Sequence, residues 1–359
     1  YRASGQTATV KLMGEVWRYT GSSGGPDEFI VRGRFNLSTT SKGTTASAAV
    51  SGISNRDKCI PFITAQINQG ATTSYYDEVL GYAYIDGSNN VQLVRASNCT
   101  TLLNARIVVV EFTGANWTVG HGSVSNIGGG STTINLNTAS TGSGGSTFNV
   151  PSWDNAFIEA TISGDNGTSN YGIEDTSFVA RPGSSTSQVT IDMDTTSVNT
   201  GTAFAHVLCH NGMDVSRTTL SQNIVPNGSY NNIGWPSGAP TGSDLSEMSM
   251  EPFVFSDGSG TALARSSVGM FCYWSGSANF VREWCHRSGN TGTYNYGVID
   301  LSPLDGSQYI IITDVDTVEV IGNAQINVVV TASAGGRAST QGTGKVELVQ
   351  NAHYNGAIV

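Results

Sequence analysis

The chain has 359 residues, more than the ~100 to 200 of an average domain, and only 12% of them are Asp, Glu, Lys or Arg. Its net charge of −10 argues against a nucleic-acid-binding face, which needs clustered Lys and Arg to meet phosphates. No run approaches the ~18 apolar residues of a spanning helix, so we expect no membrane insertion.

Glycine-rich turns divide the chain into short segments, beginning with Gly21–Gly25 and Asp86–Asn90. Positive φ angles and tight reversals cost little at such positions, so short strands between frequent turns are predicted. Residues 189–194 alternate apolar and polar side chains, a period of two that indicates a strand with one buried face. No long amphipathic helix is predicted, and Ser243–Met250 is expected to form two helical turns at most.

One pattern occurs three times: an Asx/Ser-Tyr pair, at Tyr75, Tyr171 and Tyr296, with one apolar segment before it and a dense apolar strand after it. The preceding segments are Cys59–Ile67, Ala156–Ile162 and Val268–Trp274, and the following strands are Ala105–Phe112, Ala203–Cys209 and Ala324–Val330. The spacing is that of a domain, far above the ~20 to 50 residues of a solenoid turn. The alternative is that a Gly-, Ser- and Thr-rich sequence produces such matches by chance.

These observations predict an all-β fold of tandem antiparallel β-sandwich domains, jelly-roll-like, in three related repeats. The predicted domains are residues 1–121, residues 122–217 with a Gly-rich entry, and residues 218–359 with a Pro/Gly-rich entry. Residues 126–145 and 222–244 are rich in breakers. They are interpreted either as linkers or as the opening strand and hairpin of the domain that follows.

Five cysteines are too few and too irregular for a disulfide framework: Cys59, Cys99, Cys209, Cys272 and Cys285. Cys59 with Cys99, or Cys272 with Cys285, could bridge two strands if their Cα atoms come within ~7 Å. The favoured interpretation is mostly reduced, buried thiols.

His206 and His210 lie four residues apart on a predicted strand, so both could meet one metal ion. A metal site needs three or four ligands, and no third ligand has a fixed spacing here. No metal site and no cofactor is therefore predicted, and the two histidines are interpreted as part of a polar strand face.

Two acidic pairs at strand spacing, Asp192 with Asp194 and Asp314 with Asp316, put two carboxylates on one face. Such a pair is interpreted as a solvated strand face, with calcium binding or glycoside hydrolysis as alternatives. No nucleophile elbow, phosphate-binding loop or zinc-protease helix is present. We predict that the protein is not an enzyme and has no catalytic residues.

Aromatic residues are the candidate ligand contacts, because an exposed aromatic ring stacks on a sugar while neighbouring amides supply hydrogen bonds. The glycan contacts considered are Tyr75, Tyr76, Trp117, Tyr171, Trp235 and Tyr296. Core or corner packing is the alternative for the repeated tyrosines.

Tyr82–Ile85, Val91–Arg95 and above all Val108–Val119 resemble a repeat of surface and tail-associated proteins of tailed bacteriophages. In that family, a strand ending in Val-Val-Glu-Phe closes a small β domain. The resemblance covers the first repeat well and the other two loosely. It implies a non-enzymatic virion protein, such as a tail fibre, tail-associated or capsid decoration protein, with no catalytic residues to carry over.

Three functions follow from these observations. The first is a virion structural or surface protein that assembles with itself, a trimer being one option, and with other virion proteins, and that contributes to host attachment. The second is a glycan-binding adhesin or extracellular filament protein of a bacterial cell surface, with weak sites strengthened by multivalency. A secreted glycan hydrolase is the least favoured. A homo-oligomer is expected because few Lys or Pro residues protect the sheet edges.

Overall fold

The computed structural model describes residues 14–19, 21–39, 44–69, 80–95, 102–164, 178–193, 201–212, 214–223, 230–234, 248–250, 254–257, 270–274, 280–285, 291–300, 307–312, 319–321 and 325–327. Within these residues the regular elements are strands, apart from two 3₁₀ turns, η1 (Arg56–Lys58) and η3 (Trp153–Asn155). The strands pair antiparallel throughout. The predicted all-β class is confirmed.

The first six strands after the amino-terminal one form two sheets that share a hydrophobic core. They are β2 (Ile30–Ser38), β3 (Thr45–Ala49), β4 (Cys59–Gln69), β5 (Tyr82–Ile85), β6 (Asn90–Val94) and β7 (Leu102–Glu111). The sheet orders are β2-β7-β4 and β3-β6-β5, and we call them the first sheet pair. Val91 and Leu93 alternate with less buried neighbours along β6 and meet Ile107 and Val109 of β7 in the core.

The next six strands form a second sheet pair with its own core. They are β8 (Trp117–Ser125), β9 (Gly130–Asn135), β10 (Ala156–Ile162), β11 (Phe178–Pro182), β12 (Gln188–Met193) and β13 (Thr202–His210). The sheet orders are β10-β13-β8 and β11-β12-β9. Val189, Ile191 and Met193 of β12 are buried in this core, as the alternation in the sequence predicted.

A third set of strands follows. It comprises β14 (Asp214–Asn223), β15 (Tyr230–Gly234), β16 (Met248–Met250), β17 (Val254–Asp257), β18 (Met270–Trp274), β19 (Phe280–Cys285) and β20 (Thr291–Asp300). Its sheets are β14-β20-β16, with β17 also paired to β20, and β15-β19-β18. In addition, β1 (Gly14–Tyr19) pairs with β21 (Ser307–Ile312), and β22 (Glu319–Ile321) pairs with β23 (Gln325–Asn327).

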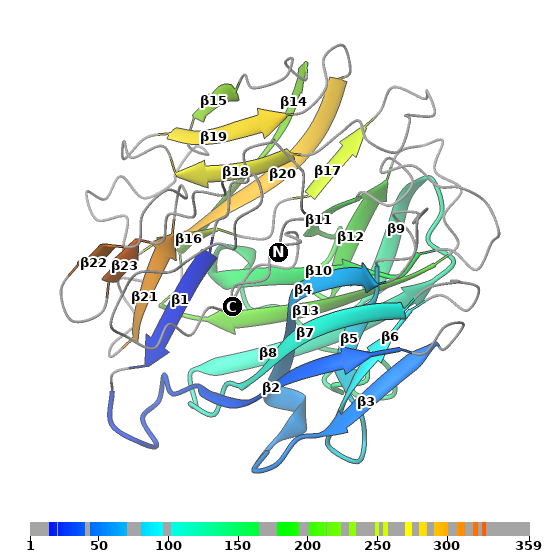
Figure 1. The fold of residues 1–359 in the computed structure, drawn as a ribbon, viewed down its shortest axis with the longest axis vertical. Helices are drawn as coiled ribbons and strands as arrows, with labels where there is room; N and C mark the ends of the chain where they lie inside the picture. Colours follow the sequence, from blue (N-terminus) through cyan, green and yellow to red (C-terminus); the bar gives the residue numbers. More distant parts are fainter. Residues whose placement is uncertain are drawn as a thin grey trace.

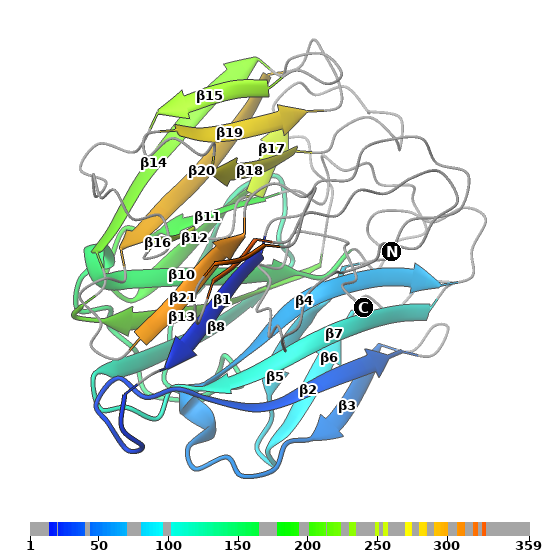
Figure 2. The ribbon, with the colours of Figure 1, turned by 60° about the vertical axis from the view of Figure 1, so that its left-hand side comes forward.

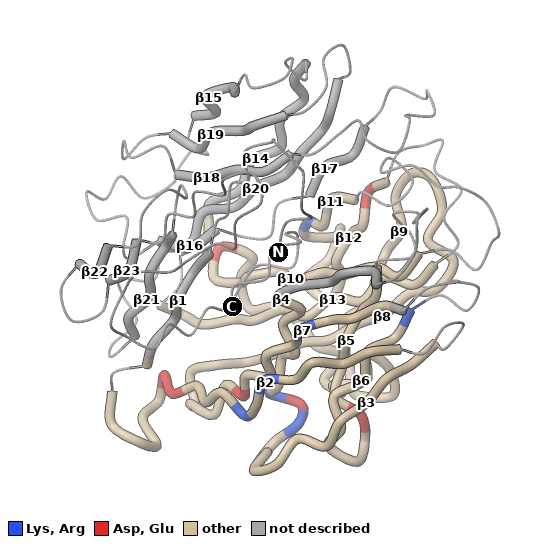
Figure 3. The backbone as a smooth tube through the Cα atoms, in the orientation of Figure 1, with Lys and Arg blue, Asp and Glu red and all other residues tan. Residues whose placement is uncertain are grey.

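The second sheet pair lies between the first pair and the third set (Figures 1 and 2). β5 contacts β10 and β13 on one side, and β11 contacts β17 and β20 on the other. Charged residues are sparse and scattered over the described part of the chain (Figure 3), in keeping with the composition.

All three sets share one order of pairing. In each sheet pair the first strand pairs with the sixth and the sixth with the third, while the second pairs with the fifth and the fifth with the fourth. The third set has the same order when β16 and β17 are counted as one strand. The predicted divisions after residues 121 and 217 fall inside β8 and β14, whereas residues 112–116 and 211–213 lie between strands.

Most predicted strands are observed. The segments 59–67, 105–112, 156–162, 203–209 and 268–274 correspond to β4, β7, β10, β13 and β18, and the described part of 324–330 is β23. Residues 126–145 contain β9, which pairs with β12, so this segment belongs to a sheet and is not a linker. Residues 222–244 likewise contain β15, paired with β19.

The helical expectation for Ser243–Met250 is wrong at its carboxyl end. Met248–Met250 is strand β16, in register with Val298–Asp300 of β20. Its backbone groups find partners on a neighbouring strand, and such pairing overrides a weak local helix preference. Residues 243–247 lie outside the described part of the chain.

Gly120 and Gly122 of β8 permit close packing inside the second sheet pair. A Cβ at Gly122 would lie 2.5 Å from Ile134 Cγ2 and 2.6 Å from the Asn135 carbonyl oxygen. We expect Gly122→Ala to lower the free energy of unfolding by about 1–3 kcal/mol, because the backbone of β9 must move. Gly128→Ala is the matched control, since a Cβ there meets nothing within 4 Å. Equal urea midpoints for the two variants would contradict this packing.

Candidate functional site

The candidate site is the buried contact between the first and second sheet pairs, which we call the seam. Along β13, Ala203, Ala205, Val207 and Cys209 face the core of the second sheet pair. The alternate residues Phe204, His206, Leu208 and His210 point the other way and are also buried. They face the first sheet pair, since β13 and β10 contact β5, and β8 contacts η1.

Two histidines meet in the seam. His121 on β8 and His206 on β13 are directly opposite in the strand register, and their Nδ1 atoms lie 2.9 Å apart. His121 Nε2 lies 3.1 Å from the carbonyl oxygen of Asp57, and His206 Nε2 lies 3.2 Å from that of Ala83. Both outer nitrogens of the pair therefore contact the first sheet pair.

Burial controls the charge of the two rings. It lowers the pKa of His121 to about 4, although the hydrogen bond to the Asp57 carbonyl and the Asp57 charge act in the opposite direction. The pKa of His206 lies well below its usual value, because of burial first and the charge of His121 second. An imidazolium loses its hydration here, so the neutral forms prevail at pH 7.

A second polar contact crosses the seam at His210. Its Nδ1 accepts a hydrogen bond from the Gly212 amide at 2.8 Å, so its proton lies on Nε2, which contacts Asp27 Oδ1 at 2.7 Å. The same Asp27 oxygen accepts from Asn116 Nδ2 at 2.7 Å. Trp117 donates its indole N–H to the Asp27 carbonyl at 2.8 Å, and its ring packs on that of His210.

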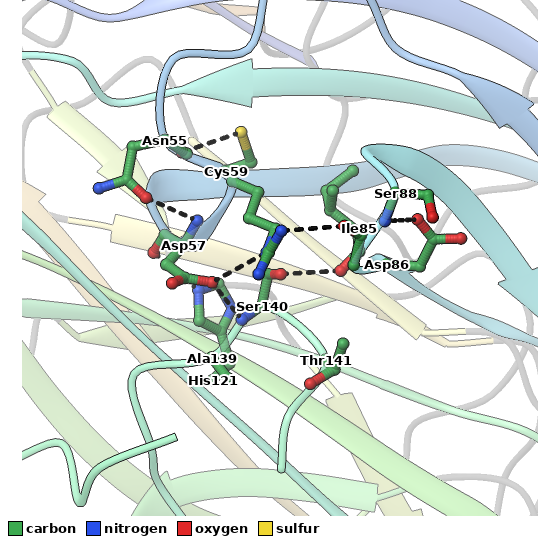
Figure 4. Close-up of polar contacts among 12 residues, drawn as sticks. Asn55, Asp57, Cys59, Ile85, Asp86, Ser88, His121, Ala139, Ser140 and Thr141 are labelled. Atoms are coloured by element: carbon green, nitrogen blue, oxygen red, sulfur yellow. Dashed lines mark hydrogen bonds and ion pairs between the residues drawn. The ribbon is translucent and has the colours of Figure 1, made fainter. Parts of the chain in front are cut away.

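A loop of the second sheet pair holds η1 and β5 together (Figure 4). The Ser140 amide donates to Asp57 Oδ1 at 3.0 Å, and Ser140 Oγ donates to the Ile85 carbonyl at 2.8 Å. Asn55 caps η1 by accepting from the Asp57 amide. Beside them, the Asp86 carboxylate accepts from the amides of the turn that follows β5.

Glu111 anchors the loop that precedes η1. Its carboxylate is fully buried and accepts from the Ser54 amide at 3.0 Å, the Asn55 amide at 2.6 Å and Arg32 Nε at 2.6 Å. This is the glutamate of the Val-Val-Glu-Phe segment that carries the family resemblance. In this protein its contacts are structural.

Three aromatic rings stack where β5 meets β13. Phe204 lies 5.7 Å from Tyr82 and 5.9 Å from Tyr84, centroid to centroid, with nearly parallel planes. Burial raises the pKa of both tyrosines, so they remain neutral phenols at physiological pH. The rings of Tyr82 and Tyr84 are therefore partly covered by this stack.

The glycan-contact prediction is corrected at Trp117. Its side chain is fully buried and has no exposed face on which a sugar could stack. Tyr296 lies on β20 opposite Thr218, and its role stays a prediction. Tyr75, Tyr76, Tyr171 and Trp235 lie outside the described residues.

His206 and His210 do not converge on one ion. The first meets His121 and the second meets Asp27. Within the described residues, no group of three or more His, Cys, Asp or Glu is placed to hold a metal ion. Asp192 is paired with Arg181 and with Ser131, while Asp194, Asp314 and Asp316 lie outside the described part.

The thiols of Cys59 and Cys209 are buried. Cys59 forms no disulfide, so the bridge to Cys99 is not formed. Burial and the nearby Glu111 charge raise the pKa of Cys59 to about 12, which makes its thiol unreactive. On neighbouring strands β18 and β19, Cys285 is opposite Met270, and Cys272 is opposite Glu283.

Sequence reasoning missed His121, Asp27, Asp57 and Glu111 as site residues. The contact between the two histidines joins positions 85 residues apart, and local periodicity carries no signal for such a distance. The one local sign was the segment Gly120-His121-Gly122, in which a histidine stands between two glycines.

Comparison with known proteins gives no assignment. No family model matches the chain, and no curated protein has a significantly similar sequence. Among the residues that the structure describes, no helix has the length and hydropathy of a membrane span.

Proposed function

We propose that this chain is a non-enzymatic structural protein of a virion surface, built as a tandem array of three related β-sandwich, jelly-roll-like domains. The observation that carries the proposal is the seam. Its histidines are engaged in contacts that join the two sheet pairs: His121 with the Asp57 carbonyl, His206 with the Ala83 carbonyl, and His210 with Asp27. Side chains that are buried in such contacts stabilise the packing of the sheets and are not exposed to a substrate.

The common order of strand pairing supports the repeat. A second parallel lies in the capped 3₁₀ turns, where Asn55 accepts from the Asp57 amide ahead of β4, and Ser152 accepts from the Asp154 amide ahead of β10. On this proposal the domain boundaries move from residues 121 and 217 to residues 112–116 and 211–213, because a boundary should not divide a strand.

The resemblance of residues 82–119 to phage surface and tail-associated proteins supports the location. We propose a tail-fibre, tail-associated or capsid decoration role, with self-assembly, trimeric or of another order, and contacts to other virion proteins and host surface glycans. A low content of charged residues also suits a displayed surface rich in neutral Ser, Thr and Asn.

Immunogold electron microscopy of the source culture tests the location. With an antibody raised against the whole chain, we expect gold particles on tails or capsids, and none when the antibody is first absorbed with purified protein. Label confined to cell envelopes or filaments would overturn the virion assignment and favour a bacterial adhesin. Release of reducing ends from host polysaccharides by purified protein would overturn the non-enzymatic assignment.

A further inference from the structure

We propose that the His121–His206 pair is a pH-sensitive contact that keeps the seam closed at neutral pH and releases it in acid. This inference concerns the joining of the two sheet pairs and does not depend on where the protein acts. It follows from the number of protons that the geometry can hold.

The His121–His206 pair makes three hydrogen-bonding contacts, but its two rings together carry only two N–H protons when both are neutral. A backbone carbonyl only accepts, so hydrogen bonds to Asp57 and Ala83 each need a proton on Nε2. The two Nδ1 lone pairs would then face each other at 2.9 Å. If one proton moves to Nδ1, the two rings form a hydrogen bond, but one bare Nε2 then faces a carbonyl oxygen. One additional proton satisfies all three contacts.

The geometry favours a proton over a metal ion between the rings. The centroid separation of 5.1 Å is close to the 2.9 Å nitrogen separation plus two ring radii. Both nitrogens thus lie near the line between the ring centres and point at each other. A metal ion bound by both nitrogens at ~2 Å in tetrahedral geometry would hold them ~3.3 Å apart, and a linear arrangement would hold them ~4 Å apart, both wider than is observed.

The elements packed around the His121–His206 pair carry ionisable groups that limit how much positive charge the pair can hold. Glu159 of β10 is buried and directly opposite His206 in the register. From η1 come the Asp57 carboxylate and Arg56, and from β5 the phenols of Tyr82 and Tyr84. Counting the Arg56 cation against the two carboxylates leaves one negative charge, which can balance one added proton. A second added proton would put two N–H groups and two positive charges face to face at 2.9 Å without water.

The sign of the pH effect follows from the proton count. The closed seam holds at most one added proton, whereas an open seam exposes both rings, each with an ordinary pKa near 6.5. Below this pH the open form binds more protons, so acid favours opening. Well above this pH the closed and the open seam bind the same number of protons, so protonation does not favour opening and the seam stays closed. His210 lies outside this pair, because it contacts the Asp27 carboxylate and not a second histidine.

Hydrogen exchange of the full chain tests the proposal. Amide exchange of β5 and β13 is measured at about pH 7.5 and about pH 5 and corrected for the intrinsic rate. We expect at least about tenfold faster corrected exchange in acid for the unmodified protein. The double variant His121→Gln and His206→Gln, which retains amide hydrogen bonding without titration, should lose most of this dependence. His210→Gln on the same strand is the control and should retain it.

Two results would overturn the proposal: the same pH dependence in the double variant as in the unmodified protein, or no faster exchange of these strands in acid. If the double variant does not fold, a histidine NMR titration of the unmodified chain decides. Two histidines with apparent pKa values below the ordinary one are expected, and ordinary values near 6.5 for all of them would refute the inference.

Discussion

Replacing Glu111 with alanine is expected to lower the free energy of unfolding by about 3–5 kcal/mol. The change leaves Arg32, which is mostly buried, without its carboxylate. It also strips the Ser54 and Asn55 amides of their acceptor, and a buried donor left unsatisfied costs about 1–3 kcal/mol. The loop ahead of η1 should detach from β7, so the loss should also appear as faster proteolysis of residues 50–58.

Urea unfolding followed by tryptophan fluorescence measures this change. Asp154→Ala is the matched control, because it removes an exposed carboxylate from the corresponding turn η3 and should alter stability by less than about 0.5 kcal/mol. Equal losses for Glu111→Ala and Asp154→Ala would refute the anchoring role of Glu111.

The contribution of Glu111 should also depend on pH. Burial by itself raises its pKa, but the hydrogen bonds from Ser54, Asn55 and Arg32 outweigh burial and lower the pKa below the usual 4.5. A carboxyl group with a lowered folded pKa adds stability above its unfolded pKa and loses it as the pH falls through the folded value. The stability gap between the unmodified protein and Glu111→Gln should therefore narrow below about pH 4.5, and a constant gap would contradict this.

Replacing Trp117 with alanine is expected to cost about 3–5 kcal/mol. Among the residues that the structure describes, Trp117 is the largest fully buried side chain, and it packs on Phe112 and His210. The truncation leaves a cavity where β7 and β8 meet. Trp117→Phe retains a six-membered aromatic ring but loses the pyrrole part of the indole and its hydrogen bond to the Asp27 carbonyl, so it should cost less than Trp117→Ala, about 1–2 kcal/mol.

Thermal melting combined with adsorption to host cells separates a core role from a glycan-binding role. If Trp117 is core, Trp117→Ala should melt earlier, and the folded fraction should adsorb normally at a temperature below its melting range. Normal melting with lost adsorption would restore Trp117 as a sugar contact.

The strands could be predicted because they depend on local sequence. The apolar segment Ala156–Ile162, identified from the sequence, coincides with β10. The alternation along β12 likewise identified its buried face. Met248–Met250 was missed because three residues have too little intrinsic preference, and only the neighbouring β20 made them a strand.

The candidate site was largely beyond prediction. Trp117 looked like a surface aromatic because it follows the polar segment Gly114-Ala115-Asn116, yet it is buried under Asp27, which lies 90 residues earlier in the chain. The sequence paired His206 with His210, four residues away, whereas the structure pairs it with His121 on the adjacent strand. Strand register across long loops is set by the packing of whole sheets, and a local pattern carries no information about it.

The sequence alone determined the secondary-structure class, the sparse charge and several of the strands of this protein, because residue spacing and turn chemistry act within a few neighbours. Only the tertiary structure decided which polar side chains are buried together. Asp27, His121 and the two histidines of β13, His206 and His210, come from three distant segments, and their burial is tolerated because each finds a hydrogen-bonding partner when the two sheet pairs meet.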